Sequence, residues 1–332
     1  MQLVFLCRKI LNFSKKRTAW IDLARVISLF VICVAHSSAF QLPGVCLVMS
    51  SVTLFFYLSG FFNSSSFWKV VIRAAKLLFV AFLWFLISAI VDCYMGKVED
   101  GFACYLVNKM LFYPAALWFI EYLVIALPVS YLVNKLPITF STVICILLTF
   151  SWCKWDYLQI IGLQEITKGH PHPDWLPFSV MIVSLGGICK RFAHGTDDIL
   201  PHMILNTLPY VGIVLCALII VVARVFGGIF TGYIDVYSIF GAYVLLSFSY
   251  YISKTMPVLS ARVAALAPSL IFVYLSHGLF NRIFITLYLR IFCSEPPDWV
   301  MCAFCASLIV GAAYLLFWSK RYRTLLFLLF AR

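Results

Sequence analysis

The sequence predicts an all-α protein, a polytopic transmembrane helix bundle of about ten spans with both termini in the cytoplasm. Hydrophobic residues make up 64% of the 332 residues and charged residues only 11%, which leaves too few polar side chains to cover a water-soluble fold. Apolar runs of about 20 residues, the length that crosses a bilayer, recur from residue 20 almost to the C-terminus. The period-two alternation of a membrane β-barrel is missing from these runs.

The predicted spans follow one another along the chain, at residues 21–38, 45–63, 70–91, 111–133, 138–153, 175–190, 208–226, 233–253, 264–289 and 299–318. Lys and Arg set the orientation, because they collect on the cytoplasmic side of membrane proteins. With the N-terminus inside, 17 of the 25 Lys and Arg residues are cytoplasmic, namely Arg8, Lys9, Lys15, Lys16, Arg17, Lys69, Arg73, Lys76, Lys135, Lys190, Arg191, Lys254, Arg262, Lys320, Arg321, Arg323 and Arg332. Basic residues that face anionic membrane lipids therefore explain the net charge of +12, and no nucleic-acid partner is expected.

Three parts make up the predicted domain organisation. Residues 1–19 form a cytoplasmic amphipathic lead-in, because the apolar patch at residues 3–6 is cut by Arg8 and Lys9 and is too short for a signal peptide. Residues 20–319 form one transmembrane domain, and residues 320–332 form a basic cytoplasmic tail.

The first span carries the most unusual polar residues, Asp22, Arg25 and His36. Arg25 and His36 are eleven residues apart, so they project from one helix face and lie roughly 16 Å apart along its axis. Charged groups inside a span are costly and are functional candidates for that reason. Arg25 could grip the phosphates of a cytosolic nucleotide-containing donor while His36 takes a proton from a hydroxyl. In the alternative interpretation, Arg25 pairs with Asp22 and His36 bonds a carbonyl.

The second and third spans carry two further pairs of candidate residues. Ser59 and Gly60 would let either a ligand or a neighbouring helix approach the backbone closely. Arg73 and Lys76 are one helical turn apart at the cytoplasmic start of the third span. There they could contact a pyrophosphate or form the ordinary basic flank of a span.

Two more titratable residues, Glu121 and His277, lie inside predicted spans. A carboxylate in the middle of a span should be protonated or paired with a cation such as Arg25. His277 lies two or three turns into its span, where it could be a second catalytic group or a histidine satisfied within the core.

Other kinds of chemistry find little support in the sequence. No phosphate-cradling Gly-rich loop and no Gly-x-Ser-x-Gly elbow is present, which disfavours ATP-driven transport and a hydrolase domain. Cys302 and Cys305 are a single pair in an apolar helix and should pack as small hydrophobic residues. His170, His172 and Asp174 belong to the longest polar insertion, which we expect to be a surface loop, so no metal site is predicted.

Asp22, Arg25 and His36, in a first span that opens Asp-x-x-Arg, resemble the membrane acyltransferase 3 family. The same order continues in the Phe-rich segment 54–62 with its Ser-Gly-Phe ending, the basic pair Arg73 and Lys76, the Trp-Phe segment 117–123 and the Tyr-Leu-x-His segment that ends at His277. The similarity covers nearly the whole chain. The chain resembles the compact members of the family, which have no appended soluble domain. Lys76 stands where the family often has a second arginine. A lysine supplies positive charge to a phosphate but cannot form the two parallel hydrogen bonds of an arginine.

The resemblance implies a transmembrane acyltransferase domain at residues 20–319, an O-acyltransferase that takes an acyl group, usually acetyl, from cytosolic acyl-CoA. The implied acceptor is a sugar hydroxyl of a cell-surface or exported glycan, and the implied location is a bacterial plasma membrane, among its lipids. His36 would be the catalytic base or acyl relay and Arg25 its essential partner. Donor binding would fall to Arg73, Lys76, Ser59 and Gly60, with support from Asp22, Glu121 and His277. Acetyl-CoA is a substrate, and no bound cofactor is expected.

The alternative function is a glycan or lipid exporter without acyl-transfer chemistry, whose polar groups would line a path across the bilayer. Transporters often carry Gly- or Pro-broken helices in corresponding halves of the chain. Pro114, Pro128 and Pro209 do not form such a paired arrangement. A membrane sensor or interaction protein has no positive feature in the sequence.

Overall fold

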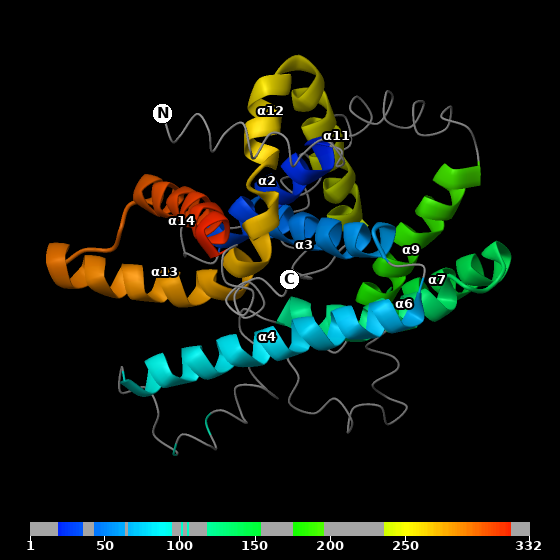
Figure 1. Ribbon diagram of the computed structural model, residues 1–332, viewed down its shortest axis with the longest axis horizontal. Helices are drawn as coiled ribbons and strands as arrows, with labels where there is room; N and C mark the ends of the chain where they lie inside the picture. Colours follow the sequence, from blue (N-terminus) through cyan, green and yellow to red (C-terminus); the bar gives the residue numbers. More distant parts are fainter. Residues whose placement is uncertain are drawn as a thin grey trace. The chain divides into compact units, whose positions relative to one another are not determined.

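The computed structural model describes residues 19–35, 43–63, 66–94, 101, 105, 118–153, 175–195 and 236–319, and its regular structure there is entirely helical. The helices, labelled in Figure 1, are α2 (Ala19–Ala35), α3 (Pro43–Phe61), α4 (Phe67–Tyr94), α6 (Trp118–Val133), α7 (Ile138–Cys153), α9 (Trp175–Gly195), α11 (Val236–Thr255), α12 (Pro257–Ala264), α13 (Leu270–Phe292) and α14 (Asp298–Ser319). A short 3₁₀ turn, η3 (Ala267–Ser269), lies between α12 and α13.

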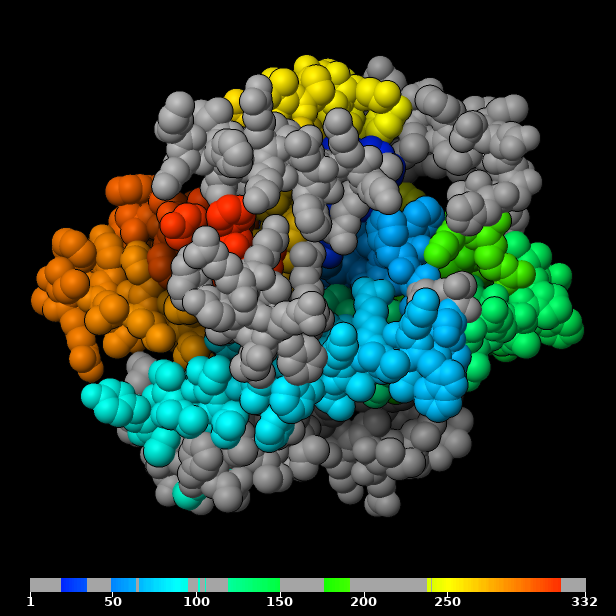
Figure 2. Space-filling view, in the orientation of Figure 1, coloured from blue at the N-terminus to red at the C-terminus, as the bar shows by residue number. Residues whose placement is uncertain are grey.

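Within the described residues, three helical stretches are long and apolar enough to cross a membrane. They are Phe67–Tyr94, Pro257–Phe292 and Asp298–Phe317, and shorter apolar helices cover Met49–Phe61, Phe119–Val133 and Ile138–Thr149. Large apolar side chains are exposed along α4, among them Trp68, Ile72 and Leu78. Figure 2 draws the side chains along α4 as spheres, in light blue to cyan. Such a surface suits a lipid environment better than water.

The helices follow the predicted spans closely wherever the structure describes them. The last predicted span, 299–318, corresponds to α14, and the span at 138–153 has the bounds of α7. The span at 208–226 lies outside the described residues, as do most of the lead-in at 1–19 and the whole tail at 320–332. Between the spans at 233–253 and 264–289 the chain is more helical than predicted. There α12 begins at Pro257, because the fixed φ of proline suits the first turn of a helix.

The helices belong to two compact units. The first contains α2, the beginning of α3, and α11 to α14, while the second contains the end of α3 with α4, α6, α7 and α9. In the first unit, α2 packs against α11, α12, α13, α14 and η3. The Trp20 and Tyr250 rings meet edge to face, 5.8 Å apart, and connect α2 to α11.

Small residues set the closest helix contact in the second unit. A Cβ atom added to Gly60 of α3 would overlap the carbonyl oxygen of Val183 in α9, and one added to Gly186 of α9 would overlap the carbonyl oxygen of Tyr57. The two backbones approach closely because neither glycine has a side chain, as is usual where membrane helices pack. This contact fixes α9, which also packs against α6 and α7.

Candidate active site

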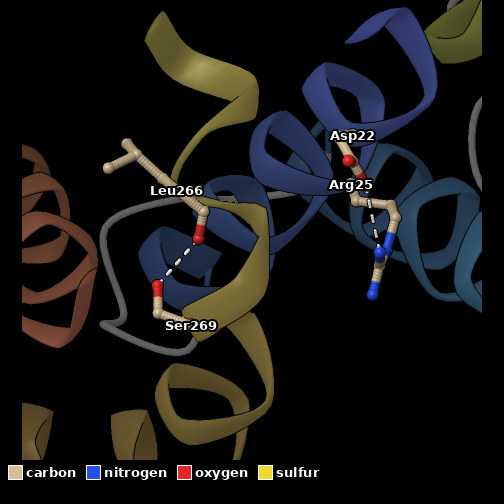
Figure 3. A network of polar contacts seen from close by, with 4 residues as sticks. All are labelled: Asp22, Arg25, Leu266 and Ser269. Atoms are coloured by element: carbon tan, nitrogen blue, oxygen red, sulfur yellow. Dashed lines mark hydrogen bonds and ion pairs between the residues drawn. The ribbon is translucent and has the colours of Figure 1, made fainter. Parts of the chain in front are cut away.

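Arg25 and Asp22, the two charged residues of the first predicted span that the structure describes, form an ion pair on α2. Arg25 Nη1 donates to Asp22 Oδ1 over 3.2 Å, three residues apart along the helix (Figure 3). The Asp22 side chain is 10% exposed and the Arg25 side chain 30%. Asp22 lies in the first turn, where a negative charge also complements the helix dipole. The pair that the sequence offered as one alternative is thus formed, and it holds an arginine with part of its surface accessible.

The α12–η3–α13 junction lies beside the helix that carries Arg25. Figure 3 shows the Ser269 hydroxyl turned toward the carbonyl oxygen of Leu266, to which it donates over 2.7 Å. This bond satisfies Ser269 within its own turn, and η3 contacts α2. The turn that contacts α2 therefore has its Ser269 hydroxyl satisfied internally.

His36, the predicted base, lies outside the described residues. The last residue of α2 is Ala35, so the described helix ends one residue before it. The role of His36 stays a prediction. In the sequence, His36 directly follows the last residue of α2.

Ser59 and Gly60 lie near the end of α3, in the second unit. The position where a Gly60 side chain would stand is occupied by the Val183 backbone, so Gly60 has a packing role with α9. Ser59 is half-buried. A contact of either residue with a donor stays a prediction.

Arg73 and Lys76 lie in the N-terminal half of α4, one turn apart as the sequence predicts. Arg73 is half-buried and Lys76 is exposed, while Ala74 and Leu77 between and beside them are buried. The two basic groups therefore flank an apolar stripe, an arrangement that suits either phosphate contact or the border of a membrane.

The Phe-rich segment 54–62 and the Trp-Phe segment 117–123, which the sequence analysis singled out, meet in the second unit. The Phe56 ring of the Phe-rich segment lies 4.5 Å from the Phe119 ring of the Trp-Phe segment and 6.5 Å from the Phe178 ring of α9, centroid to centroid. Glu121, two residues after Phe119, lies half-buried in the first turn of α6. A pairing of Glu121 with a cation stays a prediction.

His277 is completely buried in α13 of the first unit, at 0% exposure. Its Nδ1 lies 2.6 Å from the carbonyl oxygen of Tyr274, and the Tyr274 ring packs against the imidazole. A carbonyl can only accept, so Nδ1 carries the hydrogen in this bond. The backbone contact accounts for Nδ1, one of the two ring nitrogens, and a supporting catalytic role stays a prediction.

The structure thus joins some of the predicted residues and separates others by unit. Asp22, Arg25 and His277 belong to the first unit, and Asp22 contacts Arg25. The second unit holds Ser59, Gly60, Arg73, Lys76 and Glu121.

Two buried polar contacts lie where sequence reasoning placed no site. Asn281, one turn after His277, donates to the backbone of α2. Asp92, which directly follows the predicted span at 70–91, is 1% exposed near the end of α4. Asp92 Oδ2 accepts from the Tyr105 hydroxyl over 2.8 Å, which explains how a carboxylate is tolerated there. Spacing from His277 could have drawn attention to Asn281, but a search for charges overlooks a neutral amide.

A basic cluster on α9, formed by Lys190 and Arg191, bonds the ends of two other helices in the second unit. Lys190 Nζ donates to the carbonyl oxygen of Asn63 over 3.0 Å, at the end of α3. Arg191 Nη1 donates to the carbonyl oxygens of Asn134 and Leu136, over 3.0 and 2.9 Å, just past the end of α6. Positive side chains complement the negative ends of these helix dipoles.

Among the described residues, no three His, Cys, Asp or Glu side chains gather in a way that could hold a metal ion. His170, His172 and Asp174 lie outside them. In comparisons with known proteins, no family model, no curated protein and no solved structure matches the chain.

Proposed function

We propose that the protein is a membrane O-acyltransferase that moves an acyl group, acetyl in the first instance, from cytosolic acyl-CoA to a sugar hydroxyl of a cell-surface or exported glycan. The observation that carries the proposal is the polar pattern of the first span. Asp22, Arg25 and His36 interrupt an otherwise apolar segment, and α2 presents Arg25 as an oriented, partly accessible arginine. This pattern is also the most specific part of the resemblance to the acyltransferase family.

Arg25 is the proposed anchor for the donor. Its planar guanidinium can form two parallel bonds to a phosphate, and the ion pair with Asp22 limits the orientations that the side chain must give up on binding. The sequence also offers Arg73 and Lys76, which carry further positive charge, as candidates for donor binding. Acyl-CoA suits such groups because its nucleotide end is polyanionic and its thioester lies at the end of a long arm.

His36 is proposed to act on the acceptor hydroxyl. In direct transfer, the imidazole removes the proton while the hydroxyl oxygen attacks the thioester carbonyl, and the thiolate of CoA leaves and collects the proton. In a relay, the imidazole first displaces CoA to form an acyl-imidazole, which the hydroxyl then attacks. Both routes consume one thioester and release one CoA thiol for each ester formed.

The proposal includes a bundle of about ten spans in a bacterial plasma membrane, with both termini cytoplasmic. The basic cluster supports this topology. Three predicted spans end at or just before a residue of this network: the span at 45–63 at Asn63, the span at 111–133 before Asn134, and the span at 175–190 at Lys190. The orientation rule assigns all three residues to the cytoplasmic side. The Lys190 bond to Asn63 and the Arg191 bond to Asn134 connect these ends directly, as a shared side requires.

The first experiment is transfer of labelled acetyl from acetyl-CoA to the host glycan fraction in membrane vesicles, comparing the wild type with His36→Ala. We expect label with the wild type alone, while both proteins are inserted in the membrane in equal amount. Full transfer by His36→Ala would overturn the assignment of His36. Absence of label with both proteins, together with absence of CoA binding, would favour an exporter.

Arg25→Lys tests the donor anchor. Loss of one bidentate contact, about 1.4 kcal/mol, should raise the KM for acetyl-CoA roughly tenfold. Arg282→Lys is the matched control, because it makes the same change at an arginine whose Nε donates to the backbone oxygen of Gly278 on its own helix. Initial rates over a range of acetyl-CoA concentrations measure both variants. An unchanged KM for Arg25→Lys would remove Arg25 from donor binding.

A further inference from the structure

A buried asparagine connects α13 and α14 to the end of α2. Asn281 of α13 is 2% exposed, and its Nδ2 donates to the backbone carbonyl oxygen of Cys33 over 3.1 Å. On the other side of the amide, Oδ1 lies 4.0 Å from Cys305 Sγ of α14, which can donate weakly. The carbonyl of Cys33 can only accept, so the amide nitrogen must face α2 and the amide has one orientation.

The accepting carbonyl lies at a critical place along α2. Cys33 belongs to the last turn of the helix, which ends at Ala35. Carbonyl groups in the last turn lose their partners within the helix and need another donor. Water is the usual donor at an exposed end, but Cys33 is completely buried and its neighbours Ile32 and Val34 are almost so. Asn281 supplies the bond that water does not.

An apolar residue would fill this space at lower cost if packing were the only requirement. An amide inside an apolar bundle costs free energy unless it is bonded. Asn281 is bonded to a backbone atom, whose position it therefore fixes, and the bond joins residues 248 positions apart in the chain. The contact thus holds the last turn of α2 in particular. His36 follows Cys33 by three residues in the sequence.

We propose that Asn281 is a positioning residue for the active site: its amide holds the Cys33 carbonyl and thereby fixes the end of α2 that leads to His36. The catalytic consequence of this inference rests on the proposed function. The contact between Asn281 and Cys33 is independent of that function. Asn281 touches neither donor nor acceptor in this account. Its removal should affect the rate of the chemical step more than the binding of acetyl-CoA.

The test compares Asn281→Leu with Ser141→Ala, both as full chains in lipid nanodiscs. Leu keeps the approximate volume and removes the donor. Ser141 is the matched control, because it is also completely buried and also donates to a carbonyl at the end of another helix, that of Val133 in α6, over 2.7 Å. Amide hydrogen exchange over residues 30–40 should rise at least threefold in Asn281→Leu and stay unchanged in Ser141→Ala. Unchanged exchange in Asn281→Leu would overturn the proposal.

Kinetics of acetyl transfer provide the second readout. We expect kcat to fall about thirtyfold in Asn281→Leu, since a displacement of about 1 Å can cost two orders of magnitude, while the KM for acetyl-CoA stays within twofold. Ser141→Ala should keep both values. A rise in KM alone, or an equal loss of kcat in both variants, would contradict a positioning role.

Asn281→Gln covers the case in which Asn281→Leu does not fold. It keeps the amide donor on a longer side chain, and we expect it to recover more than half of the lost exchange protection and part of kcat. If Gln behaves as Leu in both readouts, the donor bond is not what matters and the proposal fails. If exchange responds as expected but the wild type transfers no acetyl, the proposed function fails while the contact with α2 stands.

Discussion

The ends of α2 and α6 are both held by side chains from other helices, but by different chemical groups. At the end of α6, Arg191 donates to two carbonyl oxygens, and the Ser141 hydroxyl donates to a third. At the end of α2, the neutral amide of Asn281 donates to the carbonyl oxygen of Cys33. Arg191 is exposed, whereas Asn281 is 2% exposed.

Burial decides which group suits each end. A guanidinium near the surface keeps its hydration and gains from the negative end of the helix dipole. The same charge beside Cys33 would lose its hydration without a counter-ion, which costs far more than one hydrogen bond returns. An amide offers a donor without a charge. The comparison teaches that both helix ends are fixed by side chains from other helices, and that the degree of burial selects the residue type.

The largest effect should come from displacing α9, which brings Arg191 to the end of α6. In Gly186→Ala the new Cβ would overlap the carbonyl oxygen of Tyr57, a backbone atom that cannot turn aside. We expect the free energy of unfolding to fall by about 3 kcal/mol, measured by SDS titration in mixed micelles. Gly311→Ala in α14 is the control, because its Cβ would meet nothing within 4 Å. Equal losses in the two variants would argue against the close α3–α9 contact.

A smaller loss is expected at the buried end of α2. Asn281→Leu leaves the Cys33 carbonyl without its donor in a place that water does not reach, so the free energy of unfolding should fall by about 2 kcal/mol. The same SDS titration measures it. A variant as stable as the wild type would mean that the amide bond contributes nothing to the fold.

The smallest loss is expected at the exposed end of α6. In Arg191→Met the carbonyl oxygens of Asn134 and Leu136 can bond water or headgroups instead, so the free energy of unfolding should change by at most about 0.5 kcal/mol. A loss as large as that of Asn281→Leu, in parallel titrations, would break the proposed link between burial and residue type.

Helix positions could be predicted largely from the sequence, because apolar runs and their flanking charges are local signals. The bounds of α7 and α14 follow from them almost residue by residue. The extra helix α12 was missed because Lys254 and Arg262 indicate a connection between spans, although basic residues do not prevent a helix there.

The partner of a polar residue was predictable from the sequence only where it lies nearby on the same helix. The pairing of Arg25 with Asp22 follows from a spacing of three residues on one helix. The bond from Asn281 to Cys33 depends on how two distant helices pack, and no local pattern encodes it. Asp92 directly follows the predicted span at 70–91, yet it is buried and accepts a hydrogen bond from Tyr105. Local rules find unusual residues, whereas tertiary packing decides what they touch.

The most direct test of the central claim is the sidedness of acetyl transfer by the wild type. Labelled acetyl-CoA, which does not cross the bilayer, is supplied to inverted and to right-side-out vesicles, and the label in the glycan fraction is counted. The account predicts label only in inverted vesicles, where the donor reaches the face assigned to the basic cluster of Lys190 and Arg191. Label from the opposite face, or no label with either preparation, would contradict it.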